Sequence, residues 1–294
     1  MMLIVFYLIF DTFTYRASMV TLSTNTQYHH AWSETMSYEL ILSEVRARVG
    51  VITMNRPDKL NAMNPQMNHE IISQIVEWSE DDSVGAIVWT GAGRGFCAGA
   101  DIGRFEARRD GQAADNAQPL VEDSWHEVIR NAKPVIAAIN GVAIGEGLTR
   151  TLPCDVRIAS ESARLSFRFV RVGLTPEFAS THYAPHLIGL GRTLEYMLRG
   201  NLIPSDEALR VGLVNYVYPD DEMLDKAVEL ATEIADNPVW QLSQVKRLVH
   251  QNYIEHDVET VLSDEGPTFQ TAMKSDAHKE ALTAFREKRQ PRFN

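Results

Sequence analysis

Residues 133–149 constrain the fold more than any other stretch of this sequence. The apolar run from Val135 to Ile139 has the length and the Val and Ile content of a buried strand, and Asn140-Gly141 closes it. Glycines then alternate at Gly145 and Gly147 before helix-forming residues begin. Glycine lets the backbone approach a ligand closely, and the first turn of a helix leaves N–H groups without internal partners. The stretch therefore predicts a buried strand, a helix, and between them a turn whose N–H groups can hold a developing negative oxygen.

A second glycine-rich stretch, residues 86–102, follows the same plan. An apolar run from Ala86 to Thr90 is typical of a buried strand, and the loop after it holds four glycines up to Gly99. If the two strands are neighbours in a sheet, each loop can supply one N–H group to the same oxygen atom.

The two stretches together resemble the crotonase superfamily, the enoyl-CoA hydratase and isomerase group. Residues 96–102 are similar to the family's Phe-x-Ala-Gly-Ala-Asp-Ile sequence, and residues 140–147 to its Asn-Gly-x-Ala-x-Gly-x-Gly sequence. The similarity extends from about Ser37 to Asn294. It implies an α/β fold, a crotonase-type ββα superhelix with a C-terminal helical trimerisation segment, and assembly as a homotrimer or a dimer of trimers.

Three segments are expected along the chain: an N-terminal extension over residues 1–36, a core over 37–235 and a helical segment over 236–294. The extension begins with ten nearly all-apolar residues, too few to span a bilayer and without a preceding basic residue as a secretory signal requires. We expect it to be disordered or to result from a wrongly assigned start, with Met36 as the true start; a membrane-surface anchor is the alternative.

Periodicity predicts several further elements. Alternation from Tyr38 to Met54 indicates a hairpin with its turn near Gly50, and a helix is expected from Pro65 to about Ser79. Beyond residue 237 the pattern is helical almost to the end.

The charge balance limits the partners. A formal net charge of −11 and an isoelectric point near 5.3 disfavour nucleic acid and anionic membranes, because attraction to phosphate supplies most non-specific affinity. No integral membrane span is expected. Any anionic ligand must therefore be bound by a local basic patch.

Two cysteines, Cys97 and Cys154, give neither a disulfide framework nor a metal pattern, so we expect a reducing, cytoplasmic location and no metal. For Cys97 a role as small apolar filler is favoured over that of a nucleophile.

The resemblance implies an acyl-CoA substrate, in which coenzyme A is part of the substrate and no separate cofactor is needed. Leu60 and Ala62 match the segment that contacts the CoA adenine and pantetheine, although a plain strand-to-helix loop is the alternative. Arg56 or Lys59 is a candidate partner for a phosphate, or is simply solvated. The substrate-binding residues implied are Leu60, Ala62, Ala98, Asp101, Ile102, Phe169, Phe285 and Lys288.

The last two of these residues lie in a C-terminal motif. Residues 285–289 are similar to the family's closing Phe-x-Glu-Lys-Arg sequence, in which Phe285 would cover the acyl-CoA and Lys288 would approach its phosphates. The neighbouring Arg286, Arg289 and Arg292 would complete the basic patch that the acidic chain otherwise lacks. A solvated, charged helix end is the alternative.

The chemistry implied by the resemblance begins with a thioester carbonyl held by two backbone N–H groups, those of Ala100 and Glu146. Donors placed where charge develops lower a reaction barrier strongly. The family usually has a small residue at position 146, so Glu146 is a departure. We expect its carboxylate to face solvent; the alternative is a carboxylate turned into the pocket as an extra base.

The position of the acid/base residue decides which reaction is expected. Family hydratases use two glutamates, and the matching positions here are Thr149 and Phe169, neither of which transfers protons as a carboxylate does. Glu177, in Thr175-Pro176-Glu177, is similar to the acidic residue of a subset of enoyl-CoA isomerases. One carboxylate suffices to move a proton from the α-carbon to the γ-carbon of a 3-enoyl thioester, and nearby Phe178 and Phe169 would raise its pKa. That Glu177 only caps the following helix is the alternative.

The expected function is therefore conversion of 3-enoyl-CoA to 2-enoyl-CoA by single-carboxylate proton transfer. Alternatives on the same scaffold are an enoyl-CoA hydratase and a hydrolase of CoA thioesters or C–C bonds. A non-catalytic acyl-CoA-binding protein is the alternative from another class, since both hydratase glutamates are absent.

Overall fold

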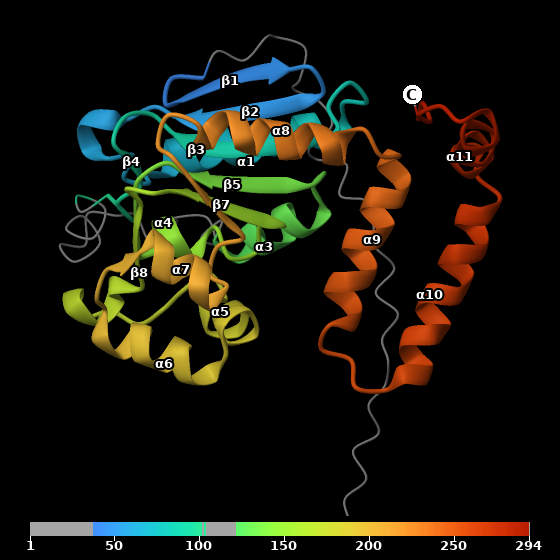
Figure 1. Cartoon of the computed structure of the whole chain (residues 1–294). Coiled ribbons are helices and arrows are strands. Elements are labelled where there is room, and N and C mark those ends of the chain that lie inside the picture. The colour runs from blue at the N-terminus through green and yellow to red at the C-terminus, as the bar shows by residue number, and fades with distance from the viewer. Residues whose placement is uncertain (1–37, 102, 104–121, 294) are drawn as a thin grey trace, which may run out of the picture. The chain divides into compact units, whose positions relative to one another are not determined.

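The computed structural model describes residues 38–101, 103 and 122–293 (Figure 1). The chain divides into the units Met1–Ser37 and Tyr38–Asn294, and every described residue belongs to the second unit. The predicted N-terminal extension and the candidate site residue Ile102 lie outside the described residues.

The larger sheet has the strand order β1-β2-β3-β5-β7-β10. The first two strands form an antiparallel hairpin, and every later neighbouring pair is parallel. Its strands are β1 Ile41–Arg46, β2 Val49–Met54, β3 Ala86–Gly91, β5 Val135–Ile139, β7 Val156–Ser160 and β10 Tyr216–Tyr218. The central strands β3 and β5 are buried along their whole length, as their continuous apolar sequences predict.

The smaller sheet has the order β4-β6-β8-β9, with parallel pairing except between the last two strands. Its strands are β4 Gly95–Cys97, β6 Val142–Ile144, β8 Arg164–Ser166 and β9 Ile203–Pro204. The chain passes from β3 to β4, from β5 to β6 and from β7 to β8, so each turn of the superhelix adds one strand to both sheets. Because β4 and β6 are paired, the segments that follow them are brought together.

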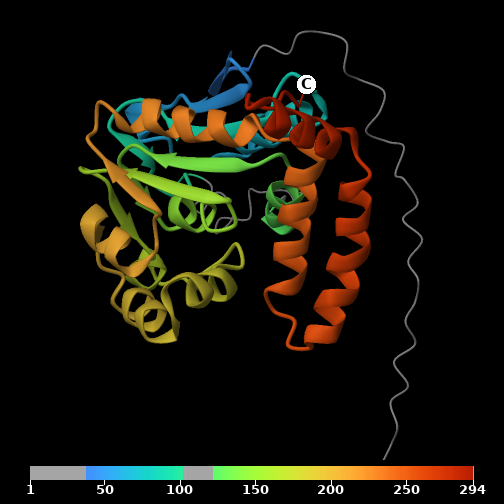
Figure 2. The same cartoon turned by 45° about the vertical axis from the view of Figure 1, so that its right-hand side comes forward.

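Helices fill the connections and cover both faces of the larger sheet (Figures 1 and 2). Helix α8, Met223–Ala235, packs on one face through Ala227, Ala231 and Ala235, whose small side chains let the helix approach β3. The opposite face is covered by the main hydrophobic core, which includes Trp89 and Trp125. The helices of the core are α1 Pro65–Glu80, α3 Glu122–Asn131, α4 Glu146–Thr149, α5 Ser180–Ile188, α6 Leu190–Arg199, α7 Ser205–Val211 and α8 Met223–Ala235, with 3₁₀ turns at Pro57–Lys59 and Arg168–Val172.

The segment after α8 is helical, as predicted. Its elements are α9 Val239–Asn252, α10 Val258–Met273 and α11 Asp276–Glu287. α9 is attached to the core by Lys246, whose Nζ lies 2.7 Å from the carboxylate of Asp155 in a partly buried pair. No helix among the described residues is both long enough and apolar enough to cross a bilayer.

The predicted hairpin is present, but its turn lies at Ala47 and Arg48 and not near Gly50. Ala47 takes the left-handed conformation, with φ of 55°. Gly50 lies inside β2, where a Cβ atom would come within 2.3 Å of the ring of Trp78. The glycine therefore makes room for a core tryptophan on α1, and close packing, not turn geometry, explains its presence.

Candidate active site

The two glycine-rich loops meet at the ends of β4 and β6. A Cβ atom on Gly99 would lie 2.9 Å from the carbonyl oxygen of Ile144 and 4.0 Å from the backbone nitrogen of Glu146. A Cβ atom on Gly147 would lie 2.2 Å from the carbonyl oxygen of Cys97. Glycine is therefore required at both positions, since any side chain would force the loops apart.

The residues on either side of Ala100 are hydrogen-bonded to Met63, and the N–H group of Ala100 itself is left out of this pairing. Met63 donates its N–H to Gly99 O at 2.8 Å and accepts from the N–H of Asp101 at 2.9 Å. This bridge uses the groups on either side of Ala100 and none of its own. Among the described residues no acceptor is found for the N–H of Ala100.

The N–H of Glu146 is similarly available at the start of α4. Gly145, with φ of 53°, donates its own N–H to Ser166 O at 2.9 Å and turns the chain into the helix. The described part of the chain offers no acceptor for the N–H of Glu146. Loops 97–101 and 144–147 thus each present one N–H group in the same region, an arrangement able to hold a carbonyl oxygen.

The side chain of Glu146 is buried, so the expectation of a solvent-facing carboxylate is wrong. It is only 2 % exposed, and its Oε1 accepts from Nε of Arg150 at 2.8 Å. Arg150 lies one helical turn later and is itself 2 % exposed. The cost of burying either charge alone explains why the two occur together.

Two aromatic rings enclose Arg150. Its guanidinium carbon lies 4.9 Å from the ring centroid of Trp125 and 4.4 Å from that of Phe178. Trp125 also donates its indole N–H to Arg150 O at 2.9 Å. Sequence reasoning missed Arg150; the i, i+4 spacing from Glu146 on a predicted helix was the available signal.

Glu177 precedes Phe178 in an irregular segment that leads into α5. Phe178 and Ala179 have φ of 54° and 52°, an unfavourable conformation for residues with side chains. The Glu177 side chain is half-buried. Ala179 is the N-cap residue of α5 and makes no side-chain cap bond, so Glu177 is not the N-cap residue. Through Phe178 and Arg150, Glu177 is linked to the loop that carries Glu146.

At the two positions that match the glutamates of family hydratases, this chain has a threonine and a phenylalanine. Thr149 is fully buried on α4, and Phe169 is 5 % exposed. The Phe169 ring would lie 3.8 Å from a Cβ atom on Gly145, so it packs against the turn before α4. Neither side chain can take up or release a proton at neutral pH.

The loop from Arg56 to Met63 lies against the loop of Ala98 and Ala100. Leu60 accepts the N–H of Ala98 at 3.0 Å, and Arg56 donates to both Ala62 O and the carboxylate of Asp101, the latter at 2.9 Å. The structure therefore brings Leu60, Ala62, Ala98 and Asp101 together. It does not leave Arg56 available for a phosphate, because its guanidinium is used to join the two loops.

The Asp101 carboxyl is tuned by this contact. The hydrogen bond from Arg56 holds its pKa below the usual value, with smaller contributions from the Gly103 N–H and Lys59. The pair is therefore charged at neutral pH, and it fixes the residue next to Ala100. These contacts give Asp101 a structural role, which is to hold the two loops together.

The C-terminal candidates lie apart from these loops. Phe285 is 82 % exposed at the end of α11, and Lys288 ends that helix with φ of 55°. Arg289 is paired with Glu280 at 2.6 Å and with Glu287 at 2.6 Å, so the predicted basic patch is partly neutralised. The proposed contacts of Phe285 and Lys288 with CoA stay predictions.

Cys97 fits the role of a small buried filler. Its side chain is fully buried against the loop of Gly147, and burial raises the pKa of its thiol to about 12. A thiol with so high a pKa is a poor nucleophile. The described residues contain no group of three or more His, Cys, Asp or Glu side chains that could hold a metal ion.

Comparison with known proteins gives the same picture over the length of the chain. The enoyl-CoA hydratase/isomerase family model matches residues 44–294. The 1,2-epoxyphenylacetyl-CoA isomerase of Escherichia coli K12 is 33 % identical over 259 residues, which cover 87 % of this chain and 98 % of that protein. The short-chain-enoyl-CoA hydratase of Clostridium acetobutylicum is 35 % identical over 261 residues, 86 % of this chain and 97 % of that protein.

Solved structures confirm the predicted fold class. A putative enoyl-CoA hydratase/carnithine racemase from Magnetospirillum magneticum AMB-1 superposes with a TM-score of 0.79 at 33 % identity, covering 88 % of this chain and all of the other. A putative enoyl-CoA hydratase from Streptomyces coelicolor A3(2) gives 0.80 at 30 % identity, over 89 % and 96 % of the two chains. The chain is therefore a member of the enoyl-CoA hydratase/isomerase family, with the crotonase fold.

Proposed function

We propose that this enzyme shifts the double bond of a 3-enoyl-CoA to give the conjugated 2-enoyl-CoA. In this mechanism the N–H groups of Ala100 and Glu146 bind the thioester oxygen and stabilise the enolate that forms when an α-proton leaves. Glu177 removes that proton and returns it at the γ-carbon. A single carboxylate serves both steps, because it is regenerated in its basic form when the proton is returned.

The observation that supports isomerisation most is the pair of substitutions at the hydratase positions. Addition of water needs one group to activate the water and another to manage the α-proton, and Thr149 and Phe169 supply neither. A single-base proton shuttle has no such requirement. Several relatives carry hydratase names, so hydration of a 2-enoyl-CoA is the reaction against which the proposal must be tested.

The test uses purified protein with a 3-enoyl-CoA and follows the conjugated thioester by its ultraviolet absorption. Wild type should form the 2-enoyl product, and Glu177→Gln should lower kcat by about 10²–10⁴-fold while the Kd for CoA stays unchanged. Glu161→Gln, at an exposed turn residue, serves as the matched control and should behave as wild type.

The outcome separates the candidates. Formation of a 3-hydroxyacyl-CoA from the 2-enoyl compound as the main activity would make the protein a hydratase. Turnover that survives Glu177→Gln would place the base elsewhere. Binding without turnover of any enoyl-CoA would leave only an acyl-CoA-binding protein.

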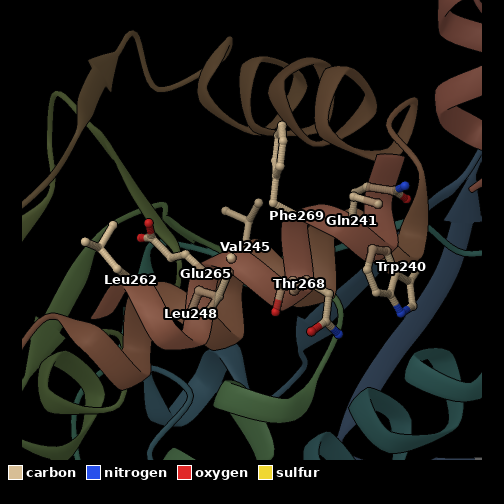
Figure 3. A pocket seen from close by; sticks show the side chains of 11 residues that line it. Trp240, Gln241, Val245, Leu248, Leu262, Glu265, Thr268 and Phe269 are labelled. Atoms are coloured by element: carbon tan, nitrogen blue, oxygen red, sulfur yellow. The ribbon is translucent and has the colours of Figure 1, made fainter. Parts of the chain in front are cut away.

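The same chain is proposed to assemble as a homotrimer or a dimer of trimers. An apolar groove lies between α9 and α10, lined by Trp240, Val245, Leu262 and Phe269 among others (Figure 3). These side chains are between 41 % and 63 % exposed. Leu190, Leu194 and Leu198 form a second exposed apolar row along α6. A closed ring of identical copies needs two different complementary surfaces, and these two supply candidates.

A further inference from the structure

The buried ion pair of Glu146 and Arg150 includes the residue whose backbone N–H is proposed to bind the thioester oxygen. Glu146 offers its backbone N–H to that oxygen, and its own carboxylate is separated from this N–H by no more than the length of the side chain. The carboxylate is buried, where charges act on one another much more strongly than in water. A bare negative charge at this place would oppose the negative charge that develops on the oxygen.

Arg150 removes that conflict. Its Nε lies 2.8 Å from the carboxylate of Glu146. The negative charge is therefore balanced by a cation four residues further along the chain. The guanidinium carbon lies 4.9 Å from the ring centroid of Trp125 and 4.4 Å from that of Phe178, so two aromatic rings help to hold the cation in place. Its Nη1 group is buried without a hydrogen-bond partner among the described residues, which is a cost to stability.

We propose that Arg150 is a positioning residue that acts through Glu146: by pairing with this buried carboxylate it keeps the oxyanion-binding peptide electrically neutral, and so allows a glutamate where a small residue would otherwise be needed. The inference rests on the oxyanion part of the proposed function and does not depend on Glu177. It explains why an incompletely bonded arginine is buried at this point of the fold.

Charge balance predicts opposite effects for the two halves of the pair. Arg150→Met keeps an apolar chain of similar length beside the two rings but removes the counter-charge of Glu146, so at a pH high enough to keep this carboxylate ionised the stabilisation of the oxyanion should fall. Glu146→Gln leaves a positive charge beside the oxyanion, so stabilisation should be kept or increased. A pair that serves only to hold the fold would lose function similarly from either side.

The experiment measures carbonyl polarisation directly, without turnover. The probe is a 2-enoyl-CoA whose acyl chain ends in a dialkylaminophenyl ring, because polarising its thioester carbonyl moves its absorption to longer wavelength. Wild type should shift the absorption to the red, Arg150→Met should lose most of that shift, and Glu146→Gln should keep it. With a 3-enoyl-CoA, kcat should fall roughly 10–100-fold in Arg150→Met, with KM little changed.

The partly buried pair of Lys246 and Asp155 supplies controls. Lys246→Met and Asp155→Asn break an ion pair of 2.7 Å that fastens α9, and both should lower the unfolding temperature while leaving the red shift unchanged. If Arg150→Met does not fold, the Glu146→Gln single variant and the Glu146→Gln/Arg150→Met double variant carry the test. Both lack the carboxylate and should keep the wild-type shift.

Three results would overturn the inference: no red shift in wild type, an unchanged shift in folded Arg150→Met, or an equal loss of shift in Glu146→Gln. A wild-type protein that shifts the probe but does not isomerise a 3-enoyl-CoA would contradict the proposed reaction and leave the role of Arg150 standing. The two failures are therefore distinguishable.

Discussion

Single glycines decide how closely the two site loops approach. Gly99 has φ of 103°, and a Cβ atom there would lie 2.9 Å from a backbone oxygen of the other loop, which cannot move as a side chain can. Gly147 is more confined still, with 2.2 Å to the carbonyl oxygen of Cys97. The spacing between the N–H groups of Ala100 and Glu146 therefore depends on the absence of side chains at these positions.

We expect Gly99→Ala to impair catalysis more than binding. The substitution should cost about 1–3 kcal/mol of stability because of the unfavourable φ, and should lower kcat by as much as roughly 100-fold because the loops must separate. Gly191→Ala is the control, since nothing lies within 4 Å of its Cβ position. Unfolding free energies and steady-state rates of the two variants provide the comparison, and equal rates would contradict the proposed spacing.

At the scale of single residues the sequence predicted some contacts and not others. The glycines of both loops, and the loss of carboxylates at Thr149 and Phe169, are readable from the sequence itself. The burial of Glu146 cannot be read from the sequence, because an i, i+4 pair on a helix is usually exposed. Its partner Arg150 is enclosed by Trp125 and Phe178, which are distant in sequence and meet only in the folded chain.

At the scale of elements, two loops of the site are joined through the carboxylate of Asp101, which pairs with Arg56 and with Lys59. Arg56 reaches the Asp101 carboxylate at 2.9 Å across 45 positions of sequence. Because of this distance in sequence, the sequence alone leaves Arg56 either a candidate partner for a phosphate or a solvated cation, and its partner Asp101 is recognised only in the folded chain. The apolar runs predict the strands themselves. The prediction of the hairpin turn near Gly50 is wrong, because this glycine makes room for Trp78 and does not form the turn.

The ion pair predicts a dependence of stability on pH. The native pKa of Asp101 is lowered below its ordinary 3.8, so the pair contributes stability above this value and loses it as the pH falls through the native pKa. Asp101→Asn should be less stable than wild type by about 1–2 kcal/mol at neutral pH, with the difference shrinking below about pH 4. Urea unfolding of both proteins across this range checks it, and a difference independent of pH would refute the assignment.

At the scale of the whole molecule, the C-terminal helices leave apolar surface uncovered. The groove between α9 and α10 has the exposed Leu262 and Phe269 on one side and the exposed Trp240 and Val245 on the other. Phe285, 82 % exposed at the end of α11, adds to this uncovered apolar surface.

Leu262→Glu should dissociate the proposed trimer or dimer of trimers. It places a charge in the groove, where burial against another copy is unfavourable for a carboxylate. Gln270→Glu adds the same charge at an exposed position of α10 that does not line the groove. Sedimentation equilibrium should give a trimer or hexamer for wild type and for Gln270→Glu, and mostly monomer for Leu262→Glu. A wild-type monomer at micromolar concentration would contradict the assembly.

The most direct test of the proposed mechanism is the crystal structure of the Glu177→Gln variant with an unconverted 3-enoyl-CoA bound. In this complex the thioester oxygen should lie about 2.7–3.1 Å from the backbone nitrogens of both Ala100 and Glu146. The side chain at position 177 should then face the α- and γ-carbons. A thioester oxygen bound to other groups, or a side chain at 177 turned away from these carbons, would contradict the mechanism.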